Sequence, residues 1–310
     1  MVQTSCIKPK LLIISGPTAS GKSSVAVRAA QEFDGEIVSC DSMQIYKGMN
    51  IGTGKINPAE QCGVPHYLLD IVYPGEEFSV SDYRNAAEKC LNDIWQRGKL
   101  PILVGGTGLY IDAVLNGLNF SAAPKSEAIR SKWKKIAEEQ GVHYLHEQLR
   151  QVDALSADKI NPNDVKRVIR ALEIYDLTGI PKSSQATCFS SCPYNFLFLV
   201  LDPDREVLYD QINQRVDAMV TAGLEQEVLS LLKFRNTQAM QAIGYKEFFA
   251  YFDGNATLAE TIERIKQNSR RYAKRQITFL KGMPAEKYFI APNYQTEIRP
   301  KIENFIKDFI

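Results

Sequence analysis

The chain has 310 residues, of which 45% are hydrophobic and 24% charged, and its formal net charge is +1 at pH 7. This composition is ordinary for a globular protein, so it excludes a chain that is mainly disordered. No window approaches the roughly 18 consecutive apolar residues of a spanning helix, and no secretory signal pattern opens the sequence, so we expect no membrane span and a cytoplasmic location.

The first part of the chain alternates short apolar runs with helical patterns. Strands are predicted at 11–15, 36–41, 66–71 and 101–104, and helices at 22–33 and 81–97. Such alternation is typical of a parallel sheet that is covered by helices.

The strand signal then disappears between residues 124 and 178. Helices are predicted at 127–139, 143–152 and 164–178, a buried strand returns at 195–201, and further helices follow at 205–222, 224–234, 246–251 and 258–281. We therefore predict an α/β core formed by residues 1–122 and 191–310, with a helical C-terminal part, and a helical insertion domain at 123–190.

Charge is unevenly distributed along the chain. Residues 261–287 contain eight basic and two acidic residues and carry a net charge of +6, which leaves −5 for the rest. A local excess of positive charge indicates an anionic partner, although a solvated helix face is the alternative.

The six cysteines indicate neither a zinc site nor a disulfide framework. No CxxC pair occurs, and the three histidines complete no zinc spacing. We expect free thiols in a reducing compartment. Cys188 and Cys192 form the one close pair in the sequence, and their redox state stays open.

The strongest motif is a phosphate-binding loop. Residues 16–23, GPTASGKS, fit G-x-x-x-x-G-K-[ST] between a predicted strand and a predicted helix. Backbone N–H groups of such a loop point at phosphate oxygens, the lysine adds a cation, and the serine hydroxyl can hold Mg²⁺. The sequence therefore predicts a P-loop NTPase-like core that binds ATP or a diphosphate through Gly16, Pro17, Thr18, Ala19, Ser20, Gly21, Lys22 and Ser23, with Ser23 on the metal.

A second candidate is Asp41, which closes the predicted strand 36–41. The carboxyl ends of parallel strands face the usual ligand crevice of an α/β sheet. Asp41 is therefore predicted to bind Mg²⁺ or to act as a general base, with the N-cap of a helix as an additional role.

Taken together, seven segments resemble the tRNA dimethylallyltransferase (tRNA isopentenyltransferase) family in its bacterial form. They are GPTASGKS (16–23), DSMQIYKGMNIGT (41–53), PHYLLDI (65–71), GGTGLYIDAVLNGL (105–118), NDVKRVIRALEIY (163–175), QAIGYKE (241–247) and KQNSRRYAKRQITFL (266–280). The resemblance implies transfer of a dimethylallyl group from dimethylallyl diphosphate to N6 of the adenosine 3′-adjacent to the tRNA anticodon, position 37, with release of diphosphate.

The resemblance also implies roles for individual residues. Asp41 would be the base, Thr107 a hydrogen-bonding group at the reacting centre, and Arg215 a contact to the diphosphate. The insertion 123–190 would contact tRNA. The implied tRNA contacts are Asp41, Ser42, Met43, Gln44, Thr107, Arg130, Lys166, Arg167, Val168, Ile169, Arg170, Gln241, Ala242, Ile243, Gly244, Tyr245, Lys246, Arg271, Lys274 and Arg275. Mg²⁺ is the expected cofactor, the tRNA anticodon stem-loop and dimethylallyl diphosphate are the expected partners, and a monomer is expected.

Two other functions compete with this one. A kinase would transfer a phosphoryl group from ATP at the same loop, and LDPDREVLYDQINQR (201–215) resembles kinase sequence. A non-catalytic RNA-binding protein would use the loop to sense a nucleotide. A mass gain of one five-carbon unit on tRNA incubated with dimethylallyl diphosphate and Mg²⁺ distinguishes the transferase from both.

Overall fold

The computed structural model of the chain describes residues 8–116, 126–185 and 192–307. The chain divides into two compact units, one made of Met1–Leu115 with Pro193–Ile310 and the other of Asn116–Cys192. The predicted insertion, 123–190, falls within the second unit.

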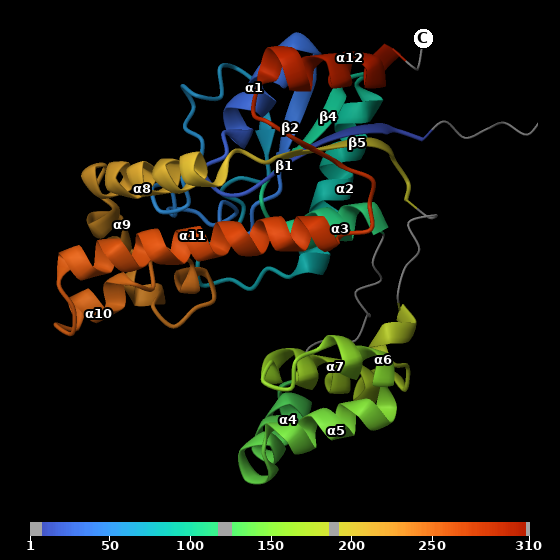
Figure 1. Ribbon diagram of the computed structural model, residues 1–310, viewed down its shortest axis with the longest axis vertical. Coiled ribbons are helices and arrows are strands. Elements are labelled where there is room, and N and C mark those ends of the chain that lie inside the picture. The colour runs from blue at the N-terminus through green and yellow to red at the C-terminus, as the bar shows by residue number, and fades with distance from the viewer. Residues whose placement is uncertain (1–7, 117–125, 186–191, 308–310) are drawn as a thin grey trace, which may run out of the picture. The chain divides into compact units, whose positions relative to one another are not determined.

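A six-stranded parallel sheet forms the centre of the first unit (Figure 1), in the order β3-β2-β4-β1-β5-β6. Its strands are β1 (Lys10–Ser15), β2 (Gly35–Ser39), β3 (His66–Tyr67), β4 (Leu100–Val104), β5 (Asn195–Leu201) and β6 (Tyr288–Ile290). The parallel α/β fold predicted from the sequence is therefore confirmed. Because β1 lies between β4 and β5, the loop that follows it emerges at the middle of the carboxyl edge of the sheet.

Helices cover this sheet and extend beyond it. Those of the first unit are α1 (Lys22–Glu32), α2 (Val80–Gln96), α3 (Gly108–Asn116), α8 (Arg205–Thr221), α9 (Leu224–Ser230), α10 (Phe248–Phe252), α11 (Leu258–Gly282) and α12 (Arg299–Lys307). Apolar side chains of α1 and α12 pack on alternate strand residues such as Leu12 and Ile14. On α2, the ring of Tyr83 stacks on Tyr110 of α3 with centroids 3.8 Å apart.

The C-terminal helices build a second apolar cluster beside the sheet. Figure 1 shows α8 and α11 side by side, and their residues are in contact. Residues of α8 to α11 pack with Ile45, Tyr46 and Met49, which follow β2. This packing fixes the segment after β2 against α8 and α11, which is the region where the site forms.

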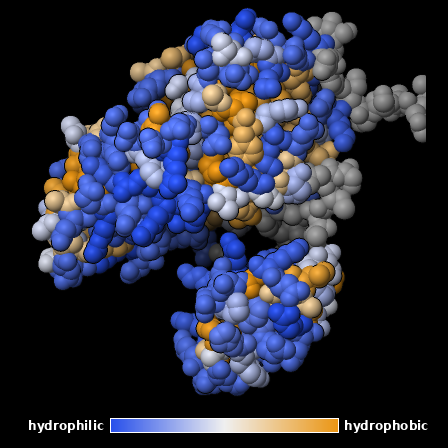
Figure 2. Space-filling model, viewed as in Figure 1, coloured by the Kyte–Doolittle hydropathy of each residue, from blue (hydrophilic) through white to orange (hydrophobic). Residues whose placement is uncertain are grey.

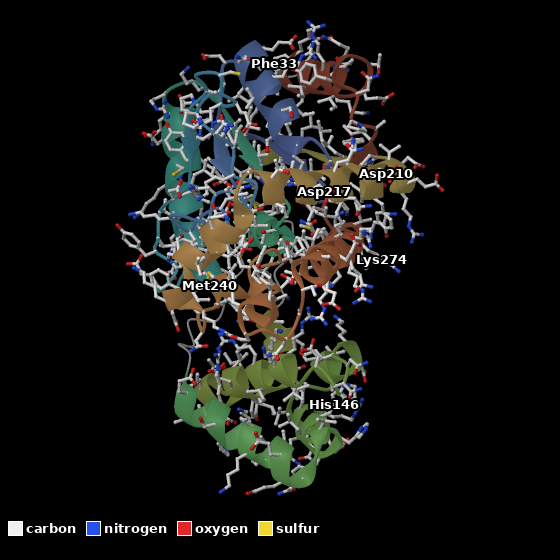
Figure 3. All side chains as sticks on the ribbon, turned by 90° about the vertical axis from the view of Figure 1, so that its left-hand side faces the viewer. Phe33, His146, Asp210, Asp217, Met240 and Lys274 are labelled. Atoms are coloured by element: carbon white, nitrogen blue, oxygen red, sulfur yellow. The ribbon has the colours of Figure 1, made fainter. Side chains whose placement is uncertain are left out.

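The second unit is helical and has its own core. It contains α4 (Glu127–Gln140), α5 (Val142–Val152), α6 (Ala154–Lys159), α7 (Val165–Thr178) and a 3-10 turn at Lys182–Gln185. Trp133, Leu145 and Leu172 are among its buried residues. His146, labelled in Figure 3, is buried in this unit, and its Nε2 lies 3.0 Å from the carbonyl oxygen of Ala157, so it has a structural role.

Several predicted elements differ from the observed ones. Strand β2 ends at Ser39, so Asp41 lies in the loop beyond the strand and does not close it. Strand β3 covers two residues instead of 66–71, because Leu68 and Asp70 have φ values of 61° and 53° and leave the extended conformation. Strand β6 and helices α3, α6 and α12 are present in addition to the predicted elements.

Two further predictions concern thiols and membranes. Cys40, Cys62 and Cys90 are free thiols. Cys188 lies outside the described residues, so the redox state of Cys188 and Cys192 stays open. Among the helices that the structure describes, none is long and apolar enough to cross a membrane.

Candidate functional site

The loop between β1 and α1 has the backbone of a phosphate cradle. Gly16 and Gly21 have φ values of 142° and 83°, and Ala19 also has a positive φ, of 63°. A Cβ on Gly16 would lie 2.5 Å from the carbonyl oxygen of Leu201, so only glycine fits there. Helix α1 begins after Gly21 without a side-chain hydrogen bond at its N-cap, which leaves its first backbone N–H groups available to an anion.

Lys22 is the cation of this loop, and its Nζ donates a hydrogen bond to the carbonyl oxygen of Pro17 at 2.5 Å. Burial, with a smaller effect of nearby Arg215, lowers the pKa of Lys22 from its ordinary value of 10.5 to about 7, and Asp41 opposes this change. Two basic groups therefore share the site with one carboxylate. A bound anion would favour the protonated form of Lys22.

Thr18, Lys22 and Ser23 open onto a cavity of about 450 Å³. The segment after β2, residues 52–56, residues 238–246, helices α8 and α11, and the ends of β2 and β4 contribute most of the remaining wall. The predicted site residues that line it are Thr18, Lys22, Ser23, Asp41, Ser42, Met43, Gln44, Arg215, Gln241, Ala242, Ile243, Gly244, Lys246 and Arg275. Residues predicted from five separate parts of the sequence thus meet in one cavity.

The carboxylate of Asp41 is held by the loop that it begins. Its Oδ1 accepts hydrogen bonds from the backbone N–H of Met43 at 2.8 Å and of Gln44 at 3.3 Å. Its Oδ2 accepts none from the described part of the chain. Residues 42–45 form a turn and not a helix, so Asp41 caps this turn and is not the helix N-cap that the sequence predicted. One oxygen of a fixed carboxylate on the cavity wall stays available for a proton.

Arg215 reaches the cavity from α8 and contacts the loop opposite. Its Nη2 donates to the carbonyl oxygen of Thr53 at 3.2 Å. The Nε2 of Gln44 donates to the same carbonyl and to that of Gly54, each at 3.4 Å. Burial lowers the pKa of Arg215 while Asp41 opposes that change, and a guanidinium stays protonated at neutral pH regardless. Arg215 is therefore a cavity residue and not part of a solvated helix face.

The end of β4 supports the loop that carries Asp41. A Cβ on Gly105 would lie 2.0 Å from the carbonyl oxygen of Cys40, so glycine allows β2 and β4 to end close together. Thr107 does not line the cavity. Its Oγ1 accepts a hydrogen bond from the backbone N–H of Ser42 at 3.0 Å, so its hydroxyl orients this loop.

Three polar residues of α11 that were not predicted from the sequence also belong to the site. Ser269, Tyr272 and Gln276 all line the cavity. Burial raises the pKa of Tyr272 to about 12, so its hydroxyl stays protonated at neutral pH. Polar residues at helical spacing within an otherwise amphipathic pattern were the signal that could have identified them.

One predicted tRNA contact in the first unit is corrected. Tyr245 is fully buried, and its hydroxyl donates to Oε1 of Glu227 at 2.6 Å. Its side chain therefore has no surface to offer to a nucleic acid and instead anchors the segment 241–246.

Helix α11 exposes the basic residues Arg271, Lys274 and Arg275. Figure 2 shows a hydrophilic surface over this helix, and Lys274 extends outward from it in Figure 3. Arg270 differs from these three because it is half-buried and donates to Oδ1 of Asn213 at 2.5 Å. The exposed basic face thus contains all three residues of this helix that the resemblance implies as tRNA contacts.

The second unit holds the remaining predicted contacts. Arg130 and Arg170 both bind the buried carboxylate of Glu173, whereas Lys166 and Arg167 are exposed. The side chains of Val168 and Ile169 are buried in the core of the unit, because they lie on the inner face of α7. Their predicted contact with tRNA is therefore corrected to a packing role.

The sequence is similar to known proteins over most of its length. A sequence model described as IPP transferase matches residues 44–283, and one described as isopentenyl transferase matches residues 9–71. A tRNA dimethylallyltransferase of Thermoanaerobacter sp. (strain X514) is 48% identical over 305 residues, 96% of each chain. That of Geobacillus thermodenitrificans is 52% identical over 281 residues, 89% of each chain.

Solved structures give the same result. The full-length tRNA isopentenylpyrophosphate transferase of Bacillus halodurans is 44% identical with a TM-score of 0.72, and the match covers 97% of this chain and 96% of that one. A eukaryotic dimethylallyltransferase acting on tRNA is 30% identical with a TM-score of 0.81, and the match covers 97% of this chain and 80% of that one.

Proposed function

The chain belongs to the tRNA dimethylallyltransferase family, and from this premise we propose how its residues carry out the reaction. The enzyme transfers a dimethylallyl group from dimethylallyl diphosphate to N6 of adenosine 37, the nucleotide 3′-adjacent to the tRNA anticodon, and releases diphosphate. One observation carries the assignment of the active site: the phosphate loop and the Asp41 carboxylate line the same cavity.

The diphosphate of the donor binds at the loop 16–23. Backbone N–H groups at the start of α1 and the cations Lys22 and Arg215 surround its oxygens. When the allylic C–O bond breaks, negative charge develops on the diphosphate, and fixed donors in a partly dehydrated site stabilise that charge. Lys22, whose pKa is near 7 in the free protein, is protonated when the anion is bound.

The acceptor is the exocyclic amine of the adenine, which must leave the stacked anticodon loop to reach the cavity. As N6 forms its bond to the allylic carbon, it loses a proton to Oδ2 of Asp41. The hydrogen bonds from Met43 and Gln44 to Oδ1 hold the carboxylate in one orientation during this step. The protonated Tyr272 hydroxyl, on the same wall, is a further donor that can orient the base.

The residues present fit a Mg²⁺ ion. Among the described residues no three His, Cys, Asp or Glu side chains gather into a metal cage. Mg²⁺ needs no such cage, because it commonly binds one or two protein oxygens together with phosphate oxygens and water. The Ser23 hydroxyl lines the cavity and would supply such a protein oxygen. When bound, the ion neutralises charge on the diphosphate.

The anticodon stem-loop contacts the exposed basic residues of α11 and of the second unit. The free thiols and the tRNA substrate support a cytoplasmic enzyme.

The test is direct. The purified enzyme is incubated with unmodified tRNA, dimethylallyl diphosphate and Mg²⁺, and the tRNA nucleosides are analysed by mass spectrometry. The expected result is a five-carbon gain on adenosine 37 and the appearance of diphosphate. Transfer of phosphate from ATP, with no change in the tRNA, would contradict the proposal.

A further inference from the structure

Glu227 of α9 makes an unusual set of contacts for a residue that does not line the cavity. Its Oε2 accepts hydrogen bonds from the backbone N–H of Asn50 at 2.9 Å and of Ile51 at 2.7 Å. Its Oε1 accepts from the backbone N–H of Gly52 at 3.0 Å and from the Tyr245 hydroxyl at 2.6 Å. One carboxylate thus binds three consecutive backbone N–H groups.

These N–H groups begin the loop that faces the active site. Beyond them, the carbonyl oxygen of Thr53 accepts hydrogen bonds from both Arg215 and Gln44. The loop also packs tightly against Arg215, because a Cβ on Gly54 would lie 1.8 Å from the Nη2 of Arg215. A shift of this loop would therefore displace the guanidinium that faces the cavity.

The tyrosine that also binds this carboxylate, Tyr245, is itself held in place. The ring of Tyr245 is buried against Gly52, where an added Cβ would lie 2.4 Å from the ring. Glu227 raises the pKa of Tyr245 further above its ordinary value, beyond the effect of burial, so this phenol is a permanent donor to the carboxylate. The carboxylate is held between a rigid ring and the loop.

We propose that Glu227 is a positioning residue for the transfer reaction, which acts by fixing residues 50–54 so that Arg215 is aimed at the leaving diphosphate. This inference rests on the role proposed above for Arg215. A carboxylate suits the task because it has acceptor oxygens only and can bind several N–H groups at once.

The test compares Glu227→Gln with Glu225→Gln. Glutamine keeps the size of Glu227 but replaces one acceptor oxygen by an NH₂ group, which is a donor. That NH₂ group would face the backbone N–H groups of residues 50–52 or the Tyr245 hydroxyl, which are donors too, so hydrogen bonds are lost. Glu225 lies on the same helix and interacts with Tyr251, so its replacement is a matched control that leaves the loop untouched. The readouts are calorimetric affinity for inorganic diphosphate, kcat and KM for dimethylallyl diphosphate, and circular dichroism.

We expect Glu227→Gln to bind diphosphate about tenfold to a hundredfold more weakly, the range of a hydrogen bond to a charged group, while Glu225→Gln binds normally. In an Arg215→Ala background the same change should have little further effect, because the group through which Glu227 acts is gone. Tyr245→Phe, which removes one hydrogen bond and keeps the ring, should weaken binding in the same direction and tests the inference if Glu227→Gln does not fold.

Two results would overturn the inference. One is unchanged diphosphate affinity in folded Glu227→Gln, or in Tyr245→Phe if that variant alone folds. The other is an equal loss with and without Arg215, which would mean that Glu227 only stabilises the fold. Neither result touches the proposed function, which depends on the mass gain of tRNA with the unaltered enzyme.

Discussion

The side-chain carbonyl of Gln276 accepts a hydrogen bond from the backbone N–H of Thr18 at 2.9 Å. The same side chain donates through Nε2 to the carbonyl oxygen of Gly106 at 3.0 Å. A Cβ on Gly106 would lie 2.2 Å from that Nε2, so glycine is required for the contact. A single buried amide on α11 therefore joins the phosphate loop after β1 to the loop after β4.

Replacement of Gln276 by alanine should affect both stability and donor binding. Removing a buried amide leaves the N–H of Thr18 and the carbonyl of Gly106 without partners, which should lower the free energy of unfolding by about 1–3 kcal/mol. The KM for dimethylallyl diphosphate should rise because the phosphate loop loses a support. Denaturant unfolding and steady-state kinetics measure the two effects. Gln267→Ala, at an exposed position of the same helix, is the control and should change neither.

Diphosphate binding should weaken as the pH rises. Lys22 has a pKa of about 7 in the free protein, so below pH 7 it is already protonated and ready for the anion. Above pH 7 it is neutral, and binding must take up a proton, which lowers the affinity by up to about tenfold per pH unit. Calorimetry between pH 6 and 9, in buffers with different ionisation enthalpies, measures both affinity and proton uptake.

Lys22→Met is the control for this pH dependence. This variant should bind diphosphate more weakly, and its affinity should change less with pH. Because the diphosphate titrates equally in both experiments, subtracting one profile from the other leaves the contribution of Lys22. Parallel profiles for the two proteins would mean that another group is responsible.

Asp41→Asn should fold normally and react slowly. The asparagine oxygen can still accept the hydrogen bonds from Met43 and Gln44, so the loop keeps its conformation. An amide cannot take up the proton of N6, and general-base catalysis is typically worth about 10²- to 10⁴-fold. The measurement is the single-turnover rate with saturating tRNA and dimethylallyl diphosphate. A rate equal to that of the unaltered enzyme across pH 6–9 would show that Asp41 is not the base.

In the second unit, Glu173 should control tRNA binding through two arginines. Its Oε1 accepts from Arg130 Nε at 2.9 Å and its Oε2 from Arg170 Nη1 at 2.7 Å, and the carboxylate is fully buried. These bonds help to lower the pKa of Glu173, against the effect of burial. Glu173→Gln should release the arginines and weaken tRNA binding several-fold, with unchanged diphosphate affinity. Glu147→Gln, exposed on α5, is the control.

Local patterns predicted most of the elements, because β1 and β5 are continuous apolar runs, α7 has helical periodicity and the phosphate loop has a fixed spacing. A strand was predicted at 66–71, but its end after Tyr67 could not be, since a leucine at position 68 gives no indication of a positive φ. Gln276 and Glu227 were missed for another reason. Their partners lie far away in the sequence, at Thr18 and Asn50, and only the fold brings them together. Glu227 is also indistinguishable by pattern from its neighbour Glu225.

Affinity for tRNA should depend steeply on salt through the exposed face of α11. Arg271, Lys274 and Arg275 are exposed, and each contact with a phosphate releases condensed cations, so log affinity falls with log salt by about 0.7 per single-strand phosphate. Replacing all three by alanine should lower affinity for every tRNA alike and reduce the slope by about 2. Donor affinity should change little, because only Arg275 also lines the cavity. Lys266→Ala is the matched control on this helix. Because Lys266 is already paired with Asp217 at 2.8 Å, its replacement should leave the slope of log affinity against log salt unchanged. An unaltered slope in the triple variant would mean that the basic face is solvated and does not bind RNA.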